Sequence, residues 1–231
     1  MNKPFITGIR DGIPIALGYL SVSFGFGILA ASLGLSPLEA FLVSATNLTS
    51  AGQVAGIEVI AAGGTLWEMA VTQLVINIRY FLMALSLSQK LDGSFHTPQR
   101  LLAAYGITDE IFGVSHSKEG KLTPLYLYGL IVIAFLGWTS GTLLGALAGD
   151  VLPKVLTDSM GIMLYGMFLA VILPEARKSR GALAVIVIAA VISILFRYVL
   201  TAVSGGFAII LSAVAAAALV ALLFPVDEKE A

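Results

Sequence analysis

Residues 67–89 read WEMAVTQLVINIRYFLMALSLSQ, an apolar stretch that is long enough to cross a bilayer as a helix. Arg79 lies near its middle, with Asn77 and Tyr80 close by. A cation at that depth costs roughly 2.5 to 17 kcal/mol, depending on the method, unless it meets a partner or a water-filled cavity. We therefore predict that Arg79 is a paired, functional residue of a substrate or proton pathway.

The rest of the chain has the same membrane character. It has 231 residues, of which 58% are hydrophobic and 12% are charged, and its apolar residues come in blocks rather than in alternation. This pattern predicts an all-α, polytopic helical bundle in the membrane. The net charge of −1 gives no sign of a nucleic-acid partner. The absence of cysteine excludes disulfides and thiolate metal ligands, and we expect no cofactor.

The apolar runs predict about six to eight membrane segments. They cover residues 13–33, 40–62, 66–87, 125–147, 155–173, 183–203 and 207–224, with a weaker segment at 101–114. The polar stretches between them are too short to fold alone. We therefore predict a single transmembrane transporter domain over residues 1–231.

Lysine and arginine are concentrated in a few short loops, which are predicted to face the cytoplasm. These basic residues are Lys3, Arg10, Lys118, Lys121, Arg177, Lys178 and Arg180. Both termini are then cytoplasmic, and the N-terminus has no signal-peptide pattern. If eight segments cross, Lys90 and Arg100 fall outside. The charges fit slightly better if 40–62 and 101–114 are broken or re-entrant, and charge counting leaves both alternatives open.

Two weaker patterns concern the packing of the bundle. The stretch at 77–80 resembles that at 195–198, and this offset of 118 residues predicts repeat halves of about 10–90 and 122–204, with a chance match as the alternative. Gly137, Gly141, Gly145 and Gly149 recur every four residues, so they share one helix face. Such a face allows another helix to approach closely, either as a fixed contact or as a sliding surface.

Residues 44–53 are unusually polar for an apolar run. Asn47 and Gln53 carry amides that lipid cannot satisfy, and Gly52 lies between them. Such a stretch is typical of a broken helix whose backbone and side chains contact substrate. The alternative is a hydrogen-bond cluster that holds helices together.

Asp109 and Glu110 lie in the weak segment and are the candidate partners of Arg79. One of them is predicted to be its counterion and the other to carry a proton. The alternative is an ordinary pair of loop carboxylates. His96 and His116 lie in polar loops and are expected to be solvated. No nucleophile–base or metal-ligand spacing occurs, so we do not expect an enzyme.

Five motifs in order resemble the AzlC family of branched-chain amino acid exporters, which includes YgaZ-type permeases. They are the stretches at 8–14, 24–27, 51–53, 77–80 and 108–110. The resemblance implies export of leucine, isoleucine, valine or a related amino acid from the bacterial cytoplasm through the inner membrane. It also implies a small AzlD-type membrane protein as partner. The family's polar positions correspond to Gln53, Asn77, Arg79, Asp109 and Glu110. Tyr80 replaces a histidine often found there, and the sequence around Gln53 also departs from the family, which leaves the choice of amino acid open.

These observations predict a carrier that exports a small apolar amino acid in exchange for protons. Arg79 and N–H groups near Gly52 would bind the substrate carboxylate. Asn47, Gln53 and Asn77 would bind its ammonium group, and Asp109 or Glu110 would carry the proton. The alternatives are the permease subunit of an ATP-driven transporter and a membrane scaffold without its own transport site.

Overall fold

The computed structural model describes residues 3–149, 179–200 and 203–224, with scattered positions between 152 and 177. In these residues every regular element is a helix, and the single strand-type contact is an isolated bridge between Leu91 and Leu122. Five of these helices are long and apolar enough to cross a membrane: α1 (Lys3–Ser32), α4 (Leu66–Ser88), α7 (Pro124–Ala148), α9 (Arg180–Tyr198) and α10 (Gly205–Leu223). The all-α membrane fold is therefore confirmed. The predicted span 155–173 falls largely outside the described residues.

The chain divides into two compact units. The first contains Met1–Gln53 and Asn77–Leu164, and the second contains Val54–Ile76 and Tyr165–Ala231. The predicted repeat halves follow a different division of the sequence and stay a prediction.

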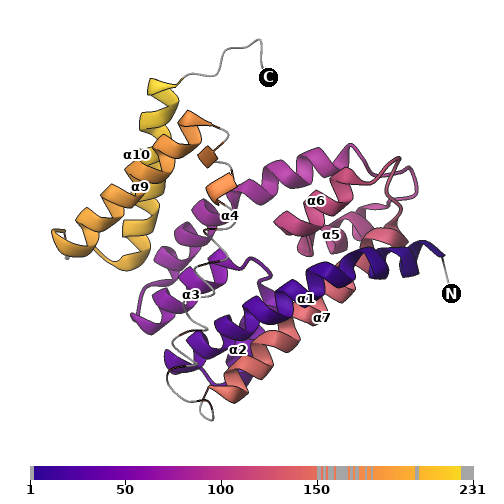
Figure 1. Cartoon of the computed structure of the whole chain (residues 1–231), viewed down its shortest axis with the longest axis horizontal. Coiled ribbons are helices and arrows are strands. Elements are labelled where there is room, and N and C mark those ends of the chain that lie inside the picture. Colours follow the sequence, from indigo (N-terminus) through magenta and orange to yellow (C-terminus); the bar gives the residue numbers. More distant parts are fainter. Residues whose placement is uncertain are drawn as a thin grey trace. The chain divides into compact units, whose positions relative to one another are not determined.

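The first unit is built on two long helices, α1 and α7, that lie side by side and run in the same direction (Figure 1). A Cβ atom added to Gly8 would lie 2.0 Å from the carbonyl oxygen of Tyr126, and one added to Gly27 would lie 2.1 Å from that of Thr142. Residues near the start of α1 contact the start of α7, and residues near its end contact the later part of α7. The two helices are therefore parallel. Glycine on both faces brings the two backbones into contact, as small residues do between membrane helices.

The four-residue glycine series of α7 is only partly used in this contact. A Cβ atom at Gly137, Gly141 or Gly145 would come within 2.4 Å of an α1 atom, whereas one at Gly149 would have its nearest neighbour at 3.5 Å. The series is therefore a close packing surface over its first three members, and Gly149 lies beyond it.

The predicted break in segment 40–62 is present. Helix α2 (Pro37–Thr46) ends before a short non-helical stretch, and α3 begins after it (Ala51–Ala61). Ser50 has a φ of +52°, a left-handed conformation that a helix cannot accommodate. Gln53 spans the break: its Nε2 donates to Ser44 Oγ at 2.8 Å, and its Oε1 accepts from the backbone N–H of Ser50 at 3.2 Å.

Segment 101–114 forms a helical hairpin of α5 (Thr97–Tyr105) and α6 (Asp109–Ser117). Its tip lies against the middle of the α1–α7 pair, where a Cβ atom at Gly106 would be 2.3 Å from Ile131. Its two ends lie where α1 and α7 begin. The Tyr128 hydroxyl donates to the Gln99 carbonyl, and Lys118 lies 3.5 Å from Asp11. The hairpin therefore enters and leaves on one side.

This arrangement favours the re-entrant alternative over the eight-segment one, in which Lys90 and Arg100 fall outside. The backbone N–H of Leu122 donates to the carbonyl of Lys90 at 2.9 Å, and Lys90 Nζ donates to the carbonyl of His116. Arg100 lies in the first turn of α5. Both residues are therefore at the same end of the unit as Lys118 and Lys121. The sequence could not show this because the contact joins two separate loops.

The second unit contains the packed pair α9 and α10 together with the first part of α4. Glu68 of α4 is buried and accepts hydrogen bonds from the Ser204 hydroxyl and from the backbone N–H of Gly206, both at the start of α10. A carboxylate at this helix end is favoured by the free N–H groups there. Arg197, for which the sequence suggested no partner, lies within electrostatic range of Glu58 in the same unit.

Candidate functional site

Arg79 of α4 forms an ion pair with Asp109 at the tip of the α5–α6 hairpin. The distance from Arg79 Nη1 to Asp109 Oδ2 is 2.9 Å, and the two side chains are 39% and 38% exposed. Asp109 is the first residue of α6, where Thr108 caps the helix by accepting from the N–H of Ile111. The start of a helix favours a negative charge. The counterion that the sequence predicts for Arg79 is therefore Asp109.

Tyr80 supports the same guanidinium from its own helix. The Arg79 Cζ atom lies 5.0 Å from the centre of the Tyr80 ring, and Nη2 donates to the Tyr80 hydroxyl at 3.4 Å. The Nε atom of Arg79 is buried and has no hydrogen-bond acceptor among the described residues. The guanidinium thus keeps donor capacity that its protein partners do not use.

Glu110 lies next to Asp109 but has a different partner. Its Oε2 accepts a hydrogen bond from the Tyr19 hydroxyl at 2.5 Å. The same hydroxyl oxygen lies 2.6 Å from Thr108 Oγ1. Tyr19 belongs to α1, is only 6% exposed, and packs edge-on against Trp138 of α7 with ring centres 5.1 Å apart. The two neighbouring carboxylates of α6 therefore have different partners: Asp109 pairs with the Arg79 guanidinium, and Glu110 accepts from the Tyr19 phenol.

A second polar cluster lies at the break between α2 and α3. The hydroxyls of Ser44 and Thr142 are 2.7 Å apart, and Gln53, which is 0% exposed, bonds to Ser44. Asn47 caps the end of α2, and its Oδ1 accepts from the Thr49 hydroxyl at 2.9 Å. The backbone N–H of Gly52 donates to the Thr49 carbonyl at 3.3 Å. These predicted ligands therefore hold the broken helix in this structure.

The two clusters are connected within the first unit. The hydroxyl of Tyr105, the last residue of α5, donates to the carbonyl of Ala45 in the last turn of α2. Thr142 of the second cluster donates to the carbonyl of Trp138, which packs on Tyr19 of the first. The carbonyl end of α2 and the N–H end of α6 have opposite helix-dipole polarity. Together they suit a ligand that carries both charges. Asn77 lies on α4 two residues before Arg79.

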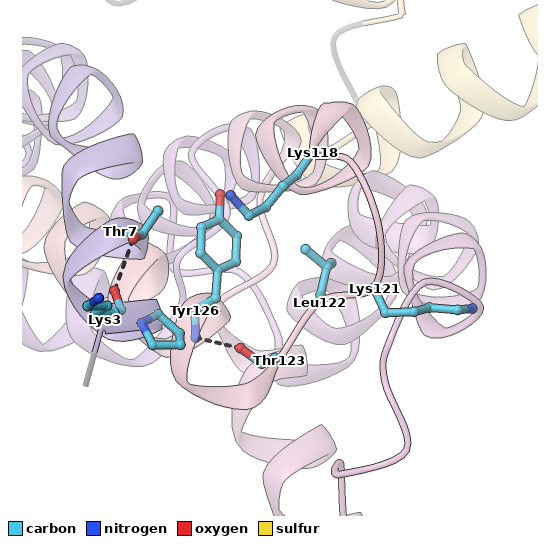
Figure 2. A pocket seen from close by; sticks show the side chains of 8 residues that line it. Lys3, Thr7, Lys118, Lys121, Leu122, Thr123 and Tyr126 are labelled. Carbon is cyan, nitrogen blue, oxygen red and sulfur yellow. Dashed lines mark hydrogen bonds between the residues drawn. The ribbon is translucent and has the colours of Figure 1, made fainter.

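A basic pocket lies apart from these clusters, at the end where α1 and α7 begin (Figure 2). It has a volume of about 330 Å³. Lys118 lies 4.2 Å from the centre of the Tyr126 ring, whereas Lys121 points away and donates to the Gln89 carbonyl. None of the predicted site residues lines this pocket. It marks the basic end of the unit.

Sequence reasoning singled out Ser44 and Thr108 only as members of the stretches 44–53 and 108–110, and it missed three other residues of the clusters, which are Tyr19, Trp138 and Thr142. Thr108 carried a usable signal, because a threonine before two acidic residues is typical of a helix start. Tyr19, Trp138 and Thr142 are isolated polar groups in apolar runs, and only the packing of α1 on α7 brings them to the site. The part of the chain that the structure describes has no cluster of residues suited to holding a metal ion.

The fold and the clusters define an integral membrane helical protein with a broken helix and an ion pair between two of its helices. Residues 14–152 match the family model described as AzlC protein, which covers more than half of the chain. The chain therefore belongs to the AzlC family.

Sequence similarity to three membrane or transport proteins agrees with this membership. The chain is 28% identical to the inner membrane protein YgaZ of Escherichia coli, over 78% of the chain and 76% of that protein. It is 32% identical to an uncharacterized membrane protein of Archaeoglobus fulgidus, over 75% of the chain and 76% of that protein. It is 20% identical to the branched-chain amino acid transport protein AzlC of Bacillus subtilis, over 73% and 66% respectively. No solved structure matches the chain.

Proposed function

We propose that this protein is a membrane transporter that exports branched-chain or similar hydrophobic amino acids from the cytoplasm in exchange for protons. The observation that carries the proposal is the Arg79–Asp109 ion pair next to the separately bonded Glu110. The similarity to a Bacillus subtilis protein named for branched-chain amino acid transport supports the substrate class.

The substrate is a zwitterion, so its site needs a group for each charge. Arg79 provides the group for the carboxylate, because its planar guanidinium binds carboxylates in a bidentate manner and its Nε has no acceptor among the described residues. Asn47, Gln53 and Asn77 are the proposed partners of the ammonium group, through their amide oxygens. Gln53 must exchange its present bond to Ser50 to do this, and the Gly52 N–H must likewise leave Thr49 to reach the carboxylate.

Competition between the proton and the substrate for one group is the simplest way to couple them in antiport. Glu110 suits this role better than Asp109. An ionised Glu110 attracts the substrate ammonium, and a proton on Glu110 removes that attraction and releases the substrate. Asp109 instead occupies Arg79 while the site is empty, so that the cation is never left unpaired in the membrane.

The proposed assembly places this chain as the large subunit of a two-component exporter with a small AzlD-like membrane protein. Its location would be the bacterial inner membrane, as for the protein YgaZ. Both termini would be cytoplasmic. The gathering of Lys90, Lys118 and Lys121 at the end where α1 begins supports this orientation, because cytoplasmic loops are enriched in basic residues.

Efflux of preloaded, labelled valine, leucine and methionine tests this function. The host cells lack their own exporters and express the chain alone or with its small partner. We expect faster efflux with both proteins, loss of it when the proton gradient is collapsed, and loss of it in Arg79→Ala and Asp109→Asn. Arg100→Ala, at the start of α5, is the matched control and should keep full activity. Efflux that depends on ATP but not on the proton gradient would favour an ATP-driven permease. No efflux of any of the three amino acids, with both proteins in the membrane, would contradict the substrate class.

A further inference from the structure

Three groups at the hairpin tip form one short chain of hydrogen bonds. The Tyr19 hydroxyl oxygen is 2.5 Å from Glu110 Oε2 and 2.6 Å from Thr108 Oγ1. A phenol has a single hydrogen and can donate only once. When Glu110 is ionised, Tyr19 must donate to the carboxylate, so the Thr108 hydroxyl must donate to Tyr19.

The same three groups can satisfy a protonated Glu110 without moving. The carboxyl O–H then donates to the Tyr19 oxygen, and the Tyr19 O–H donates to Thr108 Oγ1. Thr108 has room for this bond, because a hydroxyl has two acceptor positions and the N–H of Ile111 occupies one of them. In each protonation state of Glu110 the Tyr19 hydroxyl therefore both donates and accepts one hydrogen bond, with the direction of the chain reversed.

The groups around these three side chains leave Glu110 as the one that exchanges a proton. From α4, Arg79 and Tyr80 are the charged and titratable groups near it, and Arg79 is paired with Asp109 of α6. From α7 it meets Trp138, which does not titrate and fixes the Tyr19 ring by edge-on packing. Tyr19 and Thr108 are only 6% and 5% exposed, whereas Glu110 is exposed. Glu110 is thus the member of the chain that can exchange a proton with its surroundings.

We propose that Tyr19 and Thr108 are positioning residues that form a reversible hydrogen-bond relay on Glu110 and hold it in one place in both of its protonation states. This inference rests on the proposed role of Glu110 in proton coupling. Tyr19 keeps its proton in both states. Only the direction of its hydrogen bonds changes when Glu110 gains or loses a proton. The benefit is that the buried Tyr19 hydroxyl keeps two hydrogen bonds in either state, since an unpaired buried hydroxyl is costly in the membrane.

The test is a titration of the Glu110 carboxyl band by infrared difference spectroscopy on the full protein in lipid bilayers, with the band assigned through Glu110→Gln. In Tyr19→Phe the ionised form loses its phenol donor, so the midpoint should rise by about one pH unit. In Thr108→Val the reversed chain loses its final acceptor, so the midpoint should fall. Tyr105→Phe is the matched control, because it removes a phenol of the same hairpin that bonds to a backbone carbonyl instead. Its midpoint should equal that of the wild type.

The outcomes separate this inference from the proposed function. Midpoints that are unchanged in Tyr19→Phe, or that move in the same direction in both variants, would overturn the relay. If efflux of the wild type follows the proton gradient while these midpoints do not move, the transporter stands and the relay fails. If the midpoints move as expected but no amino acid is exported, the relay stands and the proposed substrate fails. Rescue of the Thr108→Val midpoint by Thr108→Ser would support a role of the hydroxyl itself.

Discussion

Two glycine-to-alanine substitutions in the glycine series of α7, at Gly145 and at Gly149, should differ in their effect on the stability of the protein. Gly145→Ala would place a Cβ atom 2.0 Å from the carbonyl oxygen of Phe24, and 2.8 Å from its carbonyl carbon. Ordinary contacts of a methyl group with such atoms lie above 3.4 Å, so the α1 and α7 backbones must separate locally by more than 1 Å. Neither atom belongs to a flexible side chain that can turn away.

The expected cost follows from the packing that this separation disrupts. Overpacking a tightly packed interior costs about 1–3 kcal/mol, and backbone-to-backbone contact places Gly145→Ala at the upper end. Gly149→Ala is the matched control. It lies one turn further on the same helix face, but its new Cβ atom would have its nearest neighbour at 3.5 Å. We therefore expect Gly149→Ala to leave the stability unchanged, since Gly149 is the C-cap of α7 and has an αR backbone that alanine adopts without strain.

The measurement is the thermal stability of the purified protein in detergent. Its readout is the fraction of the protein that remains monodisperse after heating. Gly145→Ala should unfold at a clearly lower temperature than the wild type, and Gly149→Ala should not. Equal stability of Gly145→Ala and the wild type would refute the parallel packing of α1 on α7. Equal losses in both variants would show that the whole series is in contact, contrary to the structure.

Three further predictions follow from other parts of the molecule. Cysteines that replace Lys90 and Lys121 one at a time, in a chain that has no cysteine of its own, should both react with a membrane-impermeant thiol reagent from the same side; labelling from opposite sides would contradict the re-entrant hairpin. Gly206→Ala should destabilise the protein, because its Cβ atom would lie 2.6 Å from Glu68 Oε1, whereas Gly205→Ala has nothing within 4 Å and should be tolerated; equal stability of the two variants would argue against the cap on α10. Gln53→Leu should lower stability by about 1–3 kcal/mol in the same thermal assay, because it removes the amide that bonds both the buried Ser44 hydroxyl and the half-buried Ser50 N–H across the break, and an unchanged value would show that the break does not depend on this amide.

Some features of the site could be read before any tertiary contact was known. The polar residues 44–53 predicted a broken helix, and the structure has the break between α2 and α3. The depth of Arg79 in its apolar stretch predicted an acidic partner, and Asp109 is that partner. The roles of these residues in transport stay predictions. Choosing between Asp109 and Glu110 required the structure, because neighbouring residues of a helix start point in different directions and meet different elements.

The sequence by itself determined the class of the protein. Long apolar runs can satisfy their backbone hydrogen bonds in lipid only as helices, and an amide or a cation within such a run needs a partner wherever the chain goes. Only the tertiary structure decided which partners meet. The parallel contact of α1 with α7, the re-entrant course of α5 and α6, and the bond of Tyr19 to Glu110 all join residues that are far apart in sequence. Such contacts depend on the shape of two packed surfaces, and a periodic pattern on one helix does not contain that information.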